Sequence, residues 1–563
     1  MLDDPTKPSY RYTLLICNCF LTFGSYFCFD MPTVLETDIQ NQVVAGFTQN
    51  VDTYYTLFYT IYAWCNMCMS LFAGWLVDRI GMRKTATLFL TLCMVGSSLF
   101  ALGASLKSAE PLTRYIIMFI GRFIFGLGGG SITIAQNAIT AKWFKGRELA
   151  FAFGCTLTLS RVGSIVNYDA TSVIYNNAEA AYPNLGLGIT LWVGAILVAV
   201  SYLFLWGFIV LDSRADRKQQ DIDAPATSAT PFLADDASKQ GDTSGGDADF
   251  AHAQTKSSFV QDMCALPVTF WLVCLIITFF YNLVFPFMAV AVDFLRTNYG
   301  DHTNEWASTR ASTVYMVSMV VSPFLGAAVD YFGRRDYLAL AGTGLSIPVF
   351  IMLGHSSIEP IVPLLILGCC YSVCAAALWP TVQLLVDKKM VGRANGIATS
   401  MQMLGIGLCN IITGVLKDGN MRHSPTAAPC CTQPNSTRTG ESKICYSEDG
   451  PQLNGLCETK HPGRGCEGLN QKDMKFQGCY GVDYSPMLQF FVAMAAIAFV
   501  CACVLKWLDR KDRALYIGIR DKNRIFEAKV GRPPEAESSS DMAEAARMAR
   551  QVLGSGGSYT ADV

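Results

Sequence analysis

The chain has 563 residues, of which 51% are hydrophobic and only 16% are charged. Soluble globular proteins usually carry about 25% charged residues, so this composition indicates a protein that lies largely in lipid. The formal net charge of −2 argues against nucleic acid as a partner, and the sequence contains no nucleophile motif, metal cluster or phosphate loop that would indicate an enzyme or a cofactor.

Taken in chain order, the apolar runs predict a polytopic membrane protein. A helix needs about 20 mostly apolar residues to cross a bilayer, and the third and ninth runs carry the weakest signal. The first run follows Lys7 and Arg11 but has no cleavage site, so we expect a retained helix rather than a signal peptide. The predicted spans are 12–35, 54–77, 85–106, 112–138, 149–174, 188–211, 266–292, 310–330, 337–355, 360–386, 394–416 and 486–508.

The fold class that these runs predict is all-α, with twelve transmembrane helices in two pseudo-symmetric six-helix bundles. Two segments are too polar to bury a core and are predicted to be disordered or soluble. The predicted domains are an N-terminal bundle at 1–211, a disordered cytosolic linker at 212–260, a C-terminal bundle at 261–508 with a cysteine-rich lumenal loop at 418–485, and a cytosolic tail at 509–563.

The charges of the connecting loops predict the orientation of the chain. Basic residues follow spans 2, 4, 8, 10 and 12, whereas the loops 36–53, 176–187 and 356–359 contain no Lys or Arg. Basic loops stay on the cytosolic side of a membrane. Both termini are therefore predicted to lie in the cytosol.

A G-x-x-x-D-x-x-G pattern occurs at 74–81 and again at 326–333, each time followed by basic residues. A Gly-Arg pair also precedes spans 5 and 11, at 146–147 and 392–393. This joint recurrence indicates a duplicated six-helix unit. Because the glycines permit close helix approach and each aspartate can face a helix N-terminus of the other half, we predict a cytosolic gate; the alternative is that the charges only set topology. The predicted gate residues are Gly74, Asp78, Arg79, Arg83, Asp330 and Arg334.

The first copy of this pattern resembles the signature loop of the major facilitator superfamily. Residues 122–128 resemble the span-4 motif of that superfamily, R-x-x-x-G-x-G. The resemblance implies solute transport by alternating access, and a structural or coupling role for Arg122, Gly126 and Gly128. Antiporters of the superfamily carry a glycine-proline motif in span 5, which residues 154–167 lack, so uniport or symport is implied.

Further stretches resemble one branch of the superfamily, the lysosomal dipeptide transporters. They lie at 23–30, 121–123, 135–137, 143–146, 161–167, 285–287 and 377–380. The resemblance implies a dipeptide or amino-acid-like substrate and a lysosomal or other endomembrane location, with the plasma membrane as the alternative. The implied partners are a small-molecule substrate, the lipid bilayer and a glycosylated single-pass accessory subunit. One position departs from the branch, because Gly130 stands where the branch has an acid.

Ionisable residues inside a membrane cost about 2.5–3.5 kcal/mol each on insertion scales and are functional candidates. The predicted spans contain Asp30, Arg122 and Arg161, so buried charge is expected only in the amino-terminal half. Small neighbours leave room for a ligand at Arg161, which we expect to bind a carboxylate through two parallel hydrogen bonds; pairing with Asp30 is the alternative. Asp30 would bind a ligand amine or pair with an arginine. The predicted substrate-binding residues are Arg161, Asp30, Tyr26, Asn167, Tyr281, Phe285, Trp379 and Gln402.

Three functions stay open at this point. The first is a transporter of dipeptides or amino-acid-like molecules, and the second is a carrier of monocarboxylates or other organic anions, which suits Arg161 and Gly130. The third is a transporter-like receptor or scaffold, which the gate motifs of both halves argue against. All five histidines lie in loops or at helix ends, so Asp30 is the only central acid expected for proton coupling, which favours facilitated diffusion.

The predicted lumenal loop before the last span contains six cysteines and the only glycosylation sequon, at Asn435. Disulfides form and glycans are added in such compartments. Six cysteines allow many connectivities, which the sequence leaves open, and zinc binding is disfavoured because the loop has no C-x-x-C pair. We predict a protective lumenal cap that takes the place of an accessory subunit. The predicted disulfide cysteines are Cys430, Cys431, Cys445, Cys457, Cys466 and Cys479.

Overall fold

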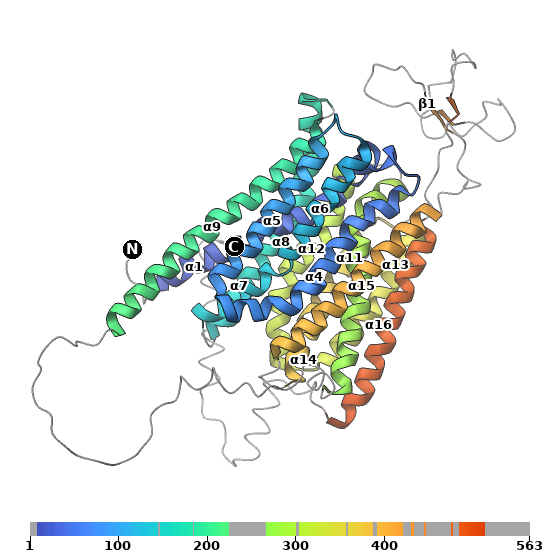
Figure 1. The fold of residues 1–563 in the computed structure, drawn as a ribbon. Coiled ribbons are helices and arrows are strands. Elements are labelled where there is room, and N and C mark those ends of the chain that lie inside the picture. The colour runs from blue at the N-terminus through green and yellow to red at the C-terminus, as the bar shows by residue number, and fades with distance from the viewer. Residues whose placement is uncertain are drawn as a thin grey trace, which may run out of the picture.

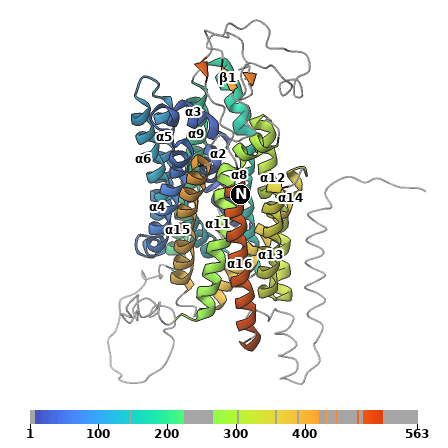
Figure 2. The same cartoon turned by 90° about the vertical axis from the view of Figure 1, so that its right-hand side faces the viewer.

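A computed structural model describes most of the chain, and in it the membrane-spanning segments run roughly parallel as one bundle of helices (Figure 1). Helices of the two halves lie side by side in both views (Figure 2). The residues described are 8–144, 147–183, 185–223, 266–299, 303–355, 358–386, 391–419, 430–432, 444–445, 475–476 and 484–512.

The amino-terminal half contains six spans, two of which are each built from two consecutive helices. The connection after the first span contains α3 (Glu36–Gln42) and the 3-10 helix η1 (Val44–Gly46). The spans are α1 (Pro8–Phe20) with α2 (Phe23–Val34), α4 (Val51–Ile80), α5 (Met82–Ser105), α6 (Pro111–Gly129) with α7 (Ile132–Trp143), α8 (Arg147–Ala181) and α9 (Gly186–Asp223).

The carboxyl-terminal half repeats this arrangement with six further spans, so the predicted all-α fold of twelve transmembrane helices is confirmed. The spans are α11 (Val268–Asn298), α12 (Asn304–Phe332), α13 (Arg335–His355), α14 (Ile361–Leu384), α15 (Val391–Gly419) and α16 (Ser485–Asp512). A small antiparallel sheet, which the sequence did not predict, lies between α15 and α16. Its strands are β1 (Cys430–Thr432), β2 (Ile444–Cys445) and β3 (Lys475–Phe476), in the order β2-β1-β3.

The prediction of which spans are weakest was wrong. Among the described residues, ten segments are long and apolar enough to span a membrane, and the third and ninth spans are two of them, as Met82–Ser105 and Arg335–Gly354. The two spans that fall short are α8 and α12. These helices pack against each other between the halves, where Ser312 donates a hydrogen bond to Asp169 (Oγ–Oδ1 3.2 Å). Their polarity therefore reflects contact with protein rather than with lipid.

The repeated glycine-aspartate pattern forms equivalent structures in the two halves. Gly81 ends α4 with φ 85° and donates its N–H to the carbonyl of Val77 (3.0 Å). Gly333 ends α12 with φ 68° and donates to the carbonyl of Val329 (2.9 Å). A positive φ is costly for residues with a Cβ, so the last glycine of each copy is required to stop its helix.

The domain boundary predicted at 211 falls inside a helix. α9 continues to Asp223, and its last turns carry Asp212 and Asp216, which bind basic residues of other helices. α15 ends at Gly419 and α16 begins at Ser485, next to the bounds of 418 and 485 that were predicted for the loop. The rest of the predicted linker and the tail after 512 lie outside the described residues.

Candidate functional site

Arg161 lies on α8 at the interface between the halves and is half-buried. Its guanidinium carbon is 4.7 Å from the ring centroid of Tyr371 on α14 and 5.9 Å from that of Tyr315 on α12. Tyr26 on α2 and Tyr281 on α11 are also close enough to act on its charge. Aromatic faces stabilise a cation, but no described carboxylate forms an ion pair with Arg161. The positive charge of Arg161 is therefore not compensated by a carboxylate of the described chain.

Asp30 on α2 provides the opposite charge nearby. Its side chain is 3% exposed, and its Oδ2 atom has no hydrogen-bond partner among the described residues. Arg161 and Arg122 both lie close enough to act on this carboxylate, although neither forms a direct ion pair with it in the described chain. An acid and a base that lie in one place without an ion pair between them suit a ligand that carries both charges.

An aromatic group of the carboxyl-terminal half lies beside Arg161. Trp379 on α14 donates its indole N–H to the hydroxyl of Tyr281 (2.9 Å). The rings of Tyr281 and Phe285 are stacked with centroids 5.7 Å apart, and Phe285 meets Tyr371 edge to face at 6.2 Å. The structure thus brings together the predicted residues of spans 7 and 10, Tyr281, Phe285 and Trp379. The sequence analysis missed Tyr371 and Tyr315, because an aromatic residue inside a span usually indicates packing.

Two further predicted residues are buried polar amides. Asn167 on α8 is fully buried; its Oδ1 accepts a hydrogen bond from Thr171 (2.7 Å), but its Nδ2 has no described partner. Gln402 on α15 is 4% exposed. Of the small residues beside Arg161, Ser160 hydrogen-bonds Thr22 (2.8 Å), and a Cβ atom at Gly163 would be 2.7 Å from the carbonyl oxygen of Phe23, so these two pack against the first span.

Gly130 lies against Asn66 of α4. A Cβ atom at position 130 would collide with the side-chain amide of Asn66, which is buried and accepts a hydrogen bond from Ser70 (3.1 Å). A neutral amide therefore occupies the space next to position 130.

Arg122 on α6 is enclosed within the amino-terminal half. It is 2% exposed, donates a long hydrogen bond to the carbonyl of Phe29 (3.4 Å), and lies over the rings of Tyr59, Phe100 and Phe125. The glycines that follow allow close helix packing, because a Cβ atom at Gly126 would be 2.8 Å from the carbonyl oxygen of Tyr62. These contacts favour a structural role for the span-4 motif.

We call the end of the bundle that carries the basic loops the basic end. One cluster of charges lies there. Arg83 binds Asp212 and Asp216 of α9. Lys142 lies 2.9 Å from Asp212, and the indole of Trp143 donates to the same carboxylate (2.7 Å). All five residues belong to the amino-terminal half, and we call this group the Asp212 cluster.

Three of the other predicted gate residues, Gly74, Arg79 and Arg334, can be located in the described part of the structure. A Cβ atom at Gly74 would meet nothing within 4 Å, so the close helix approach expected there is not realised. Arg79 is exposed and lies over Trp75 of its own helix, and Arg334 is exposed at the start of α13. The side chains of Asp78 and Asp330 lie outside the described part of the structure.

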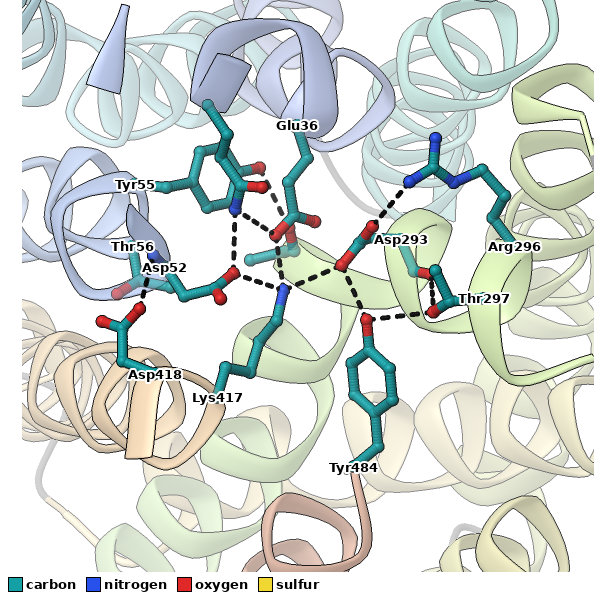
Figure 3. A network of polar contacts seen from close by, with 12 residues as sticks. Glu36, Asp52, Tyr55, Thr56, Asp293, Arg296, Thr297, Lys417, Asp418 and Tyr484 are labelled. Atoms are coloured by element: carbon teal, nitrogen blue, oxygen red, sulfur yellow. Dashed lines mark hydrogen bonds and ion pairs between the residues drawn. The ribbon is translucent and has the colours of Figure 1, made fainter. Parts of the chain in front are cut away.

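At the opposite end, which we call the α3 end, a buried charge cluster connects the two halves (Figure 3). The ammonium of Lys417 on α15 lies 2.7 Å from Glu36 of α3, 2.8 Å from Asp52 of α4 and 3.0 Å from Asp293 of α11. These four residues are the Lys417 cluster. Asp418 accepts hydrogen bonds from the backbone N–H groups of Asp52 (3.0 Å) and Thr53 (2.7 Å), so it also crosses the interface.

This cluster corrects the expectation that buried charge is confined to the amino-terminal half. The Lys417 side chain is 0% exposed and that of Asp293 is 10% exposed. Both belong to the carboxyl-terminal half, one residue beyond the spans predicted at 394–416 and 266–292. Charge at those positions was interpreted as the end of a helix, whereas both helices continue.

Most described hydrogen bonds between the halves lie toward the α3 end. Tyr55 donates to the carbonyl of Ala289 (3.1 Å), Tyr168 donates to the carbonyl of Met288 (3.3 Å), and Asn176 donates to Glu305 (2.9 Å). Toward the basic end the described chain has one hydrogen bond between the halves, which Ser400 donates to the carbonyl of Met67 (2.9 Å). The structure thus represents a conformation that is closed at the α3 end.

The side chains of the six loop cysteines and Asn435 lie outside the described part of the structure. The backbone register of the small sheet pairs Cys430 with Cys445, and Cys431 with Ile444 and Phe476. The predicted disulfides and glycan stay predictions.

Comparison with known proteins identifies relatives over most of the chain. The family model described as "Major Facilitator Superfamily" matches residues 15–409. The proteins named "Lysosomal dipeptide transporter MFSD1" from Homo sapiens and Pongo abelii are each 32% identical over 421 residues, which cover 74% of this chain and 82% of each relative.

Solved transporters share the fold at low sequence identity. A D-xylose–proton symporter has a TM-score of 0.54 at 14% identity and covers 73% of this chain and 91% of its own. A bacterial homologue of the human lysosomal transporter Spinster has a TM-score of 0.52 at 14% identity and covers 90% and 98%. The family model spans well over half of the sequence and the fold agrees with it. The chain therefore belongs to the Major Facilitator Superfamily, and it is a multi-pass membrane transporter that works by alternating access.

Proposed function

We propose that this transporter carries dipeptides or amino-acid-like molecules and that Arg161 binds their carboxylate. The observation that carries the proposal is the position of Arg161, which lies between the halves without a carboxylate partner in the described chain. The nearby Asp30 carboxylate suits the ammonium of a zwitterion. The name of the human and orangutan relatives, which describes dipeptide transport, supports the same substrate class.

The proposed setting is a lysosomal or other endomembrane with the basic end in the cytosol. The positive-inside pattern supports this orientation and a cytosolic location of both termini, and the names of the relatives support the organelle. In that orientation the α3 end faces the lumen. Transport is proposed to be uniport or symport, and the Asp78 and Asp330 motifs are proposed to form the cytosolic gate.

The cysteine-rich loop is proposed to be a lumenal cap, linked by disulfides and glycosylated at Asn435. The helices on either side of the loop both begin or end beside the Lys417 cluster. α15 ends two residues after Lys417. Tyr484, directly before α16, donates a hydrogen bond to Asp293 (2.7 Å). This placement supports a cap over the α3 end, in place of a glycosylated accessory subunit.

The carboxylate assignment is tested by comparing an acid with its amide. The purified protein is screened by thermal shift with dialanine and dialanine amide. A ligand at about 100 times its dissociation constant stabilises by roughly 2.7 kcal/mol. Wild-type protein should prefer the free acid, Arg161→Lys should bind it more weakly because a point charge lacks the two-pronged geometry, and Arg161→Ala should lose it.

Arg122→Lys is the matched control, because Arg122 is also a buried arginine of the amino-terminal half but is enclosed by aromatic rings. It should leave the preference for acid over amide unchanged. Equal binding of acid and amide by the wild type would remove the carboxylate role of Arg161 and make it a structural charge.

A second candidate is a carrier of monocarboxylates or other organic anions. The contact between Gly130 and Asn66 favours it, because a neutral amide lies beside the position where the related branch has an acid. Lactate in the same screen separates the candidates. If lactate stabilises the protein as much as dialanine does, the amine contributes nothing and the anion carrier is the better description.

A further inference from the structure

The contacts of the Lys417 cluster converge on one oxygen of each carboxylate (Figure 3). Lys417 Nζ approaches Glu36 Oε1, Asp52 Oδ1 and Asp293 Oδ2. Gln40 donates to the same Glu36 and Asp52 oxygens, at 3.2 and 2.8 Å. The second oxygen of Glu36, Oε2, is buried and has no hydrogen-bond partner in the described chain, although the residue is only 1% exposed. Burying an ionised carboxylate costs free energy when one of its oxygens has neither water nor a hydrogen-bond donor.

The cluster also contains more acids than bases. Glu36, Asp52 and Asp293 bring three carboxylates to one ammonium of Lys417. Arg296 adds a second cation at the rim, with Nη2 3.3 Å from Asp293 Oδ1 and its side chain 24% exposed. Three carboxylates against two cations leave one negative charge without compensation. Buried groups in this position bind a proton rather than stay charged.

The other groups around Glu36 do not supply the missing positive charge. Tyr55 of α4 and Tyr484 at the start of α16 are phenols, and Tyr484 donates to Asp293. Asp418 of α15 adds a further carboxylate, which the first N–H groups of α4 stabilise. Asp38, on the same helix as Glu36, is acidic and lies near Arg296.

Glu36 is the member best placed to hold this proton. It lies in α3, beyond the first span that ends at Val34. Burial, the largest cause, raises the pKa of Glu36 well above its ordinary value; Lys417 opposes this shift, and Asp293 and Asp52 reinforce it. Opening of the α3 end would move Glu36 and Asp52, on one half, away from Lys417 and Asp293 on the other, and would return Glu36 to water.

We propose that the Lys417 cluster is a proton-operated latch, in which Glu36 binds a proton as the α3 end closes and releases it to the same side when that end opens. The proton comes from and returns to the solution on that side, so it sets the pH dependence of closure without being transported. This inference rests on alternating access and not on the identity of the solute.

The direction of the pH effect follows from linkage. The closed form binds the proton more tightly, so closure is fully favoured below the ordinary pKa of a glutamate. Between that value and the raised pKa, each unit of rising pH lowers the ratio of closed to open by about tenfold. Above the raised pKa the ratio no longer changes. An acidic compartment on the α3 side would therefore hold this end shut.

The test is hydrogen–deuterium exchange of the full-length protein in lipid nanodiscs at pH 5, 6, 7 and 8, with rates corrected for intrinsic exchange. No substrate is added, so the result is independent of the proposed dipeptide function. In the wild type, residues 36–46 should be protected at pH 5 and should exchange at least about tenfold faster at pH 8. Glu36→Gln, which mimics the protonated acid, should be protected at every pH.

Glu110→Gln is the matched control, because Glu110 is an exposed acid at the same end of the bundle and outside the cluster. It should keep the wild-type pH profile. The proposal is overturned if wild-type exchange in 36–46 does not vary with pH, or if Glu36→Gln varies as the wild type does.

A second variant covers the case in which Glu36→Gln folds poorly. Lys417 opposes protonation of Glu36, so Lys417→Met should move the midpoint of the pH profile to higher pH. A midpoint that stays in place or falls would contradict the latch. Release to the same side is tested without substrate in liposomes that contain a pH dye. A step of the outer pH from 5 to 8 should cause no Glu36-dependent proton flux across the membrane. A flux that Glu36→Gln abolishes would contradict release to the same side.

Discussion

The two charge clusters of this transporter have similar chemistry but different positions in the fold. The Asp212 cluster draws its residues from α5, α7 and α9 of one half, and its basic side chains are 29% and 32% exposed. The Lys417 cluster draws on both halves, and its side chains are at most 10% exposed. A cluster within one half moves as a rigid unit during alternating access, whereas a cluster across the interface must break. The first is therefore expected to determine stability and the second the conformational equilibrium.

The largest effect is expected from removing Asp212. Its side chain is 0% exposed and binds Arg83, Lys142 and Trp143 at once. Breaking a buried charge network by removing one partner costs about 3–5 kcal/mol, because the remaining charges lose their compensation. Asp212→Ala should strongly lower the melting temperature of the purified protein in detergent.

Asp216→Ala is the control for this prediction. Asp216 contacts the same two bases but its side chain is 46% exposed, so the expected loss is about 0–1 kcal/mol. A wild-type melting temperature for Asp212→Ala would mean that the basic-end cluster does not hold the amino-terminal half together.

A smaller and different effect is expected at Asp418, which caps α4 from the other half of the protein. Loss of a helix cap costs about 0.5–2 kcal/mol, and here that energy belongs only to the conformation closed at the α3 end. Asp418→Ala should lower the ratio of closed to open roughly two- to thirtyfold. Hydrogen–deuterium exchange in the first turns of α4 measures this change.

Thr303→Ala provides a matched cap that does not cross the interface, because Thr303 accepts from the N–H of Trp306 within the carboxyl-terminal half (3.2 Å). It should destabilise the start of α12 and leave exchange in α4 unchanged. If both variants open α4 equally, the caps act through general stability and the contrast between the clusters fails.

The contrast also explains how far the sequence could predict this protein. The spans and the repeat were recognisable because apolar length and spacing are local signals, and charge inside a span, also a local signal, made Asp30 and Arg161 candidates. Lys417 and Glu36 are separated by 381 positions, and no local pattern relates a loop acid to a lysine at the end of a distant helix. Charge at a helix end predicts a boundary, so the residues that join the halves were interpreted as the ends of their spans.

A third effect concerns the predicted cytosolic gate. A charge at a helix terminus contributes about 0.3–1 kcal/mol, and up to about 2 kcal/mol when partly buried. Asp78→Asn should therefore slow transport a few-fold while leaving the melting temperature close to the wild type, unlike Asp212→Ala. Uptake into vesicles at matched protein levels measures it. Wild-type rates would leave the motif with a topological role only.

Substitutions in the loop before α16 are expected to have the smallest effect on the two charge clusters. The register of β1 and β2 pairs Cys430 with Cys445. Directly opposed residues of antiparallel strands have Cα atoms about 4.5–5.5 Å apart, which is within the range of about 4.4–6.8 Å that a disulfide needs. We therefore predict a bridge between these two cysteines, which peptide mapping without reduction should detect, with no free thiol among the six loop cysteines.

Removing this bridge tests whether the Lys417 cluster acts on its own. The described ion pairs of the cluster involve only α3, α4, α11 and α15, so Cys445→Ser should leave exchange in 36–46 and in α4 as in the wild type. A substitution away from both clusters should change the free energy of unfolding of the helical bundle by no more than about 0.5 kcal/mol. If exchange at the α3 end rises in Cys445→Ser, the loop helps to hold that end closed. The difference between the clusters would then depend on the cap as well as on the charges.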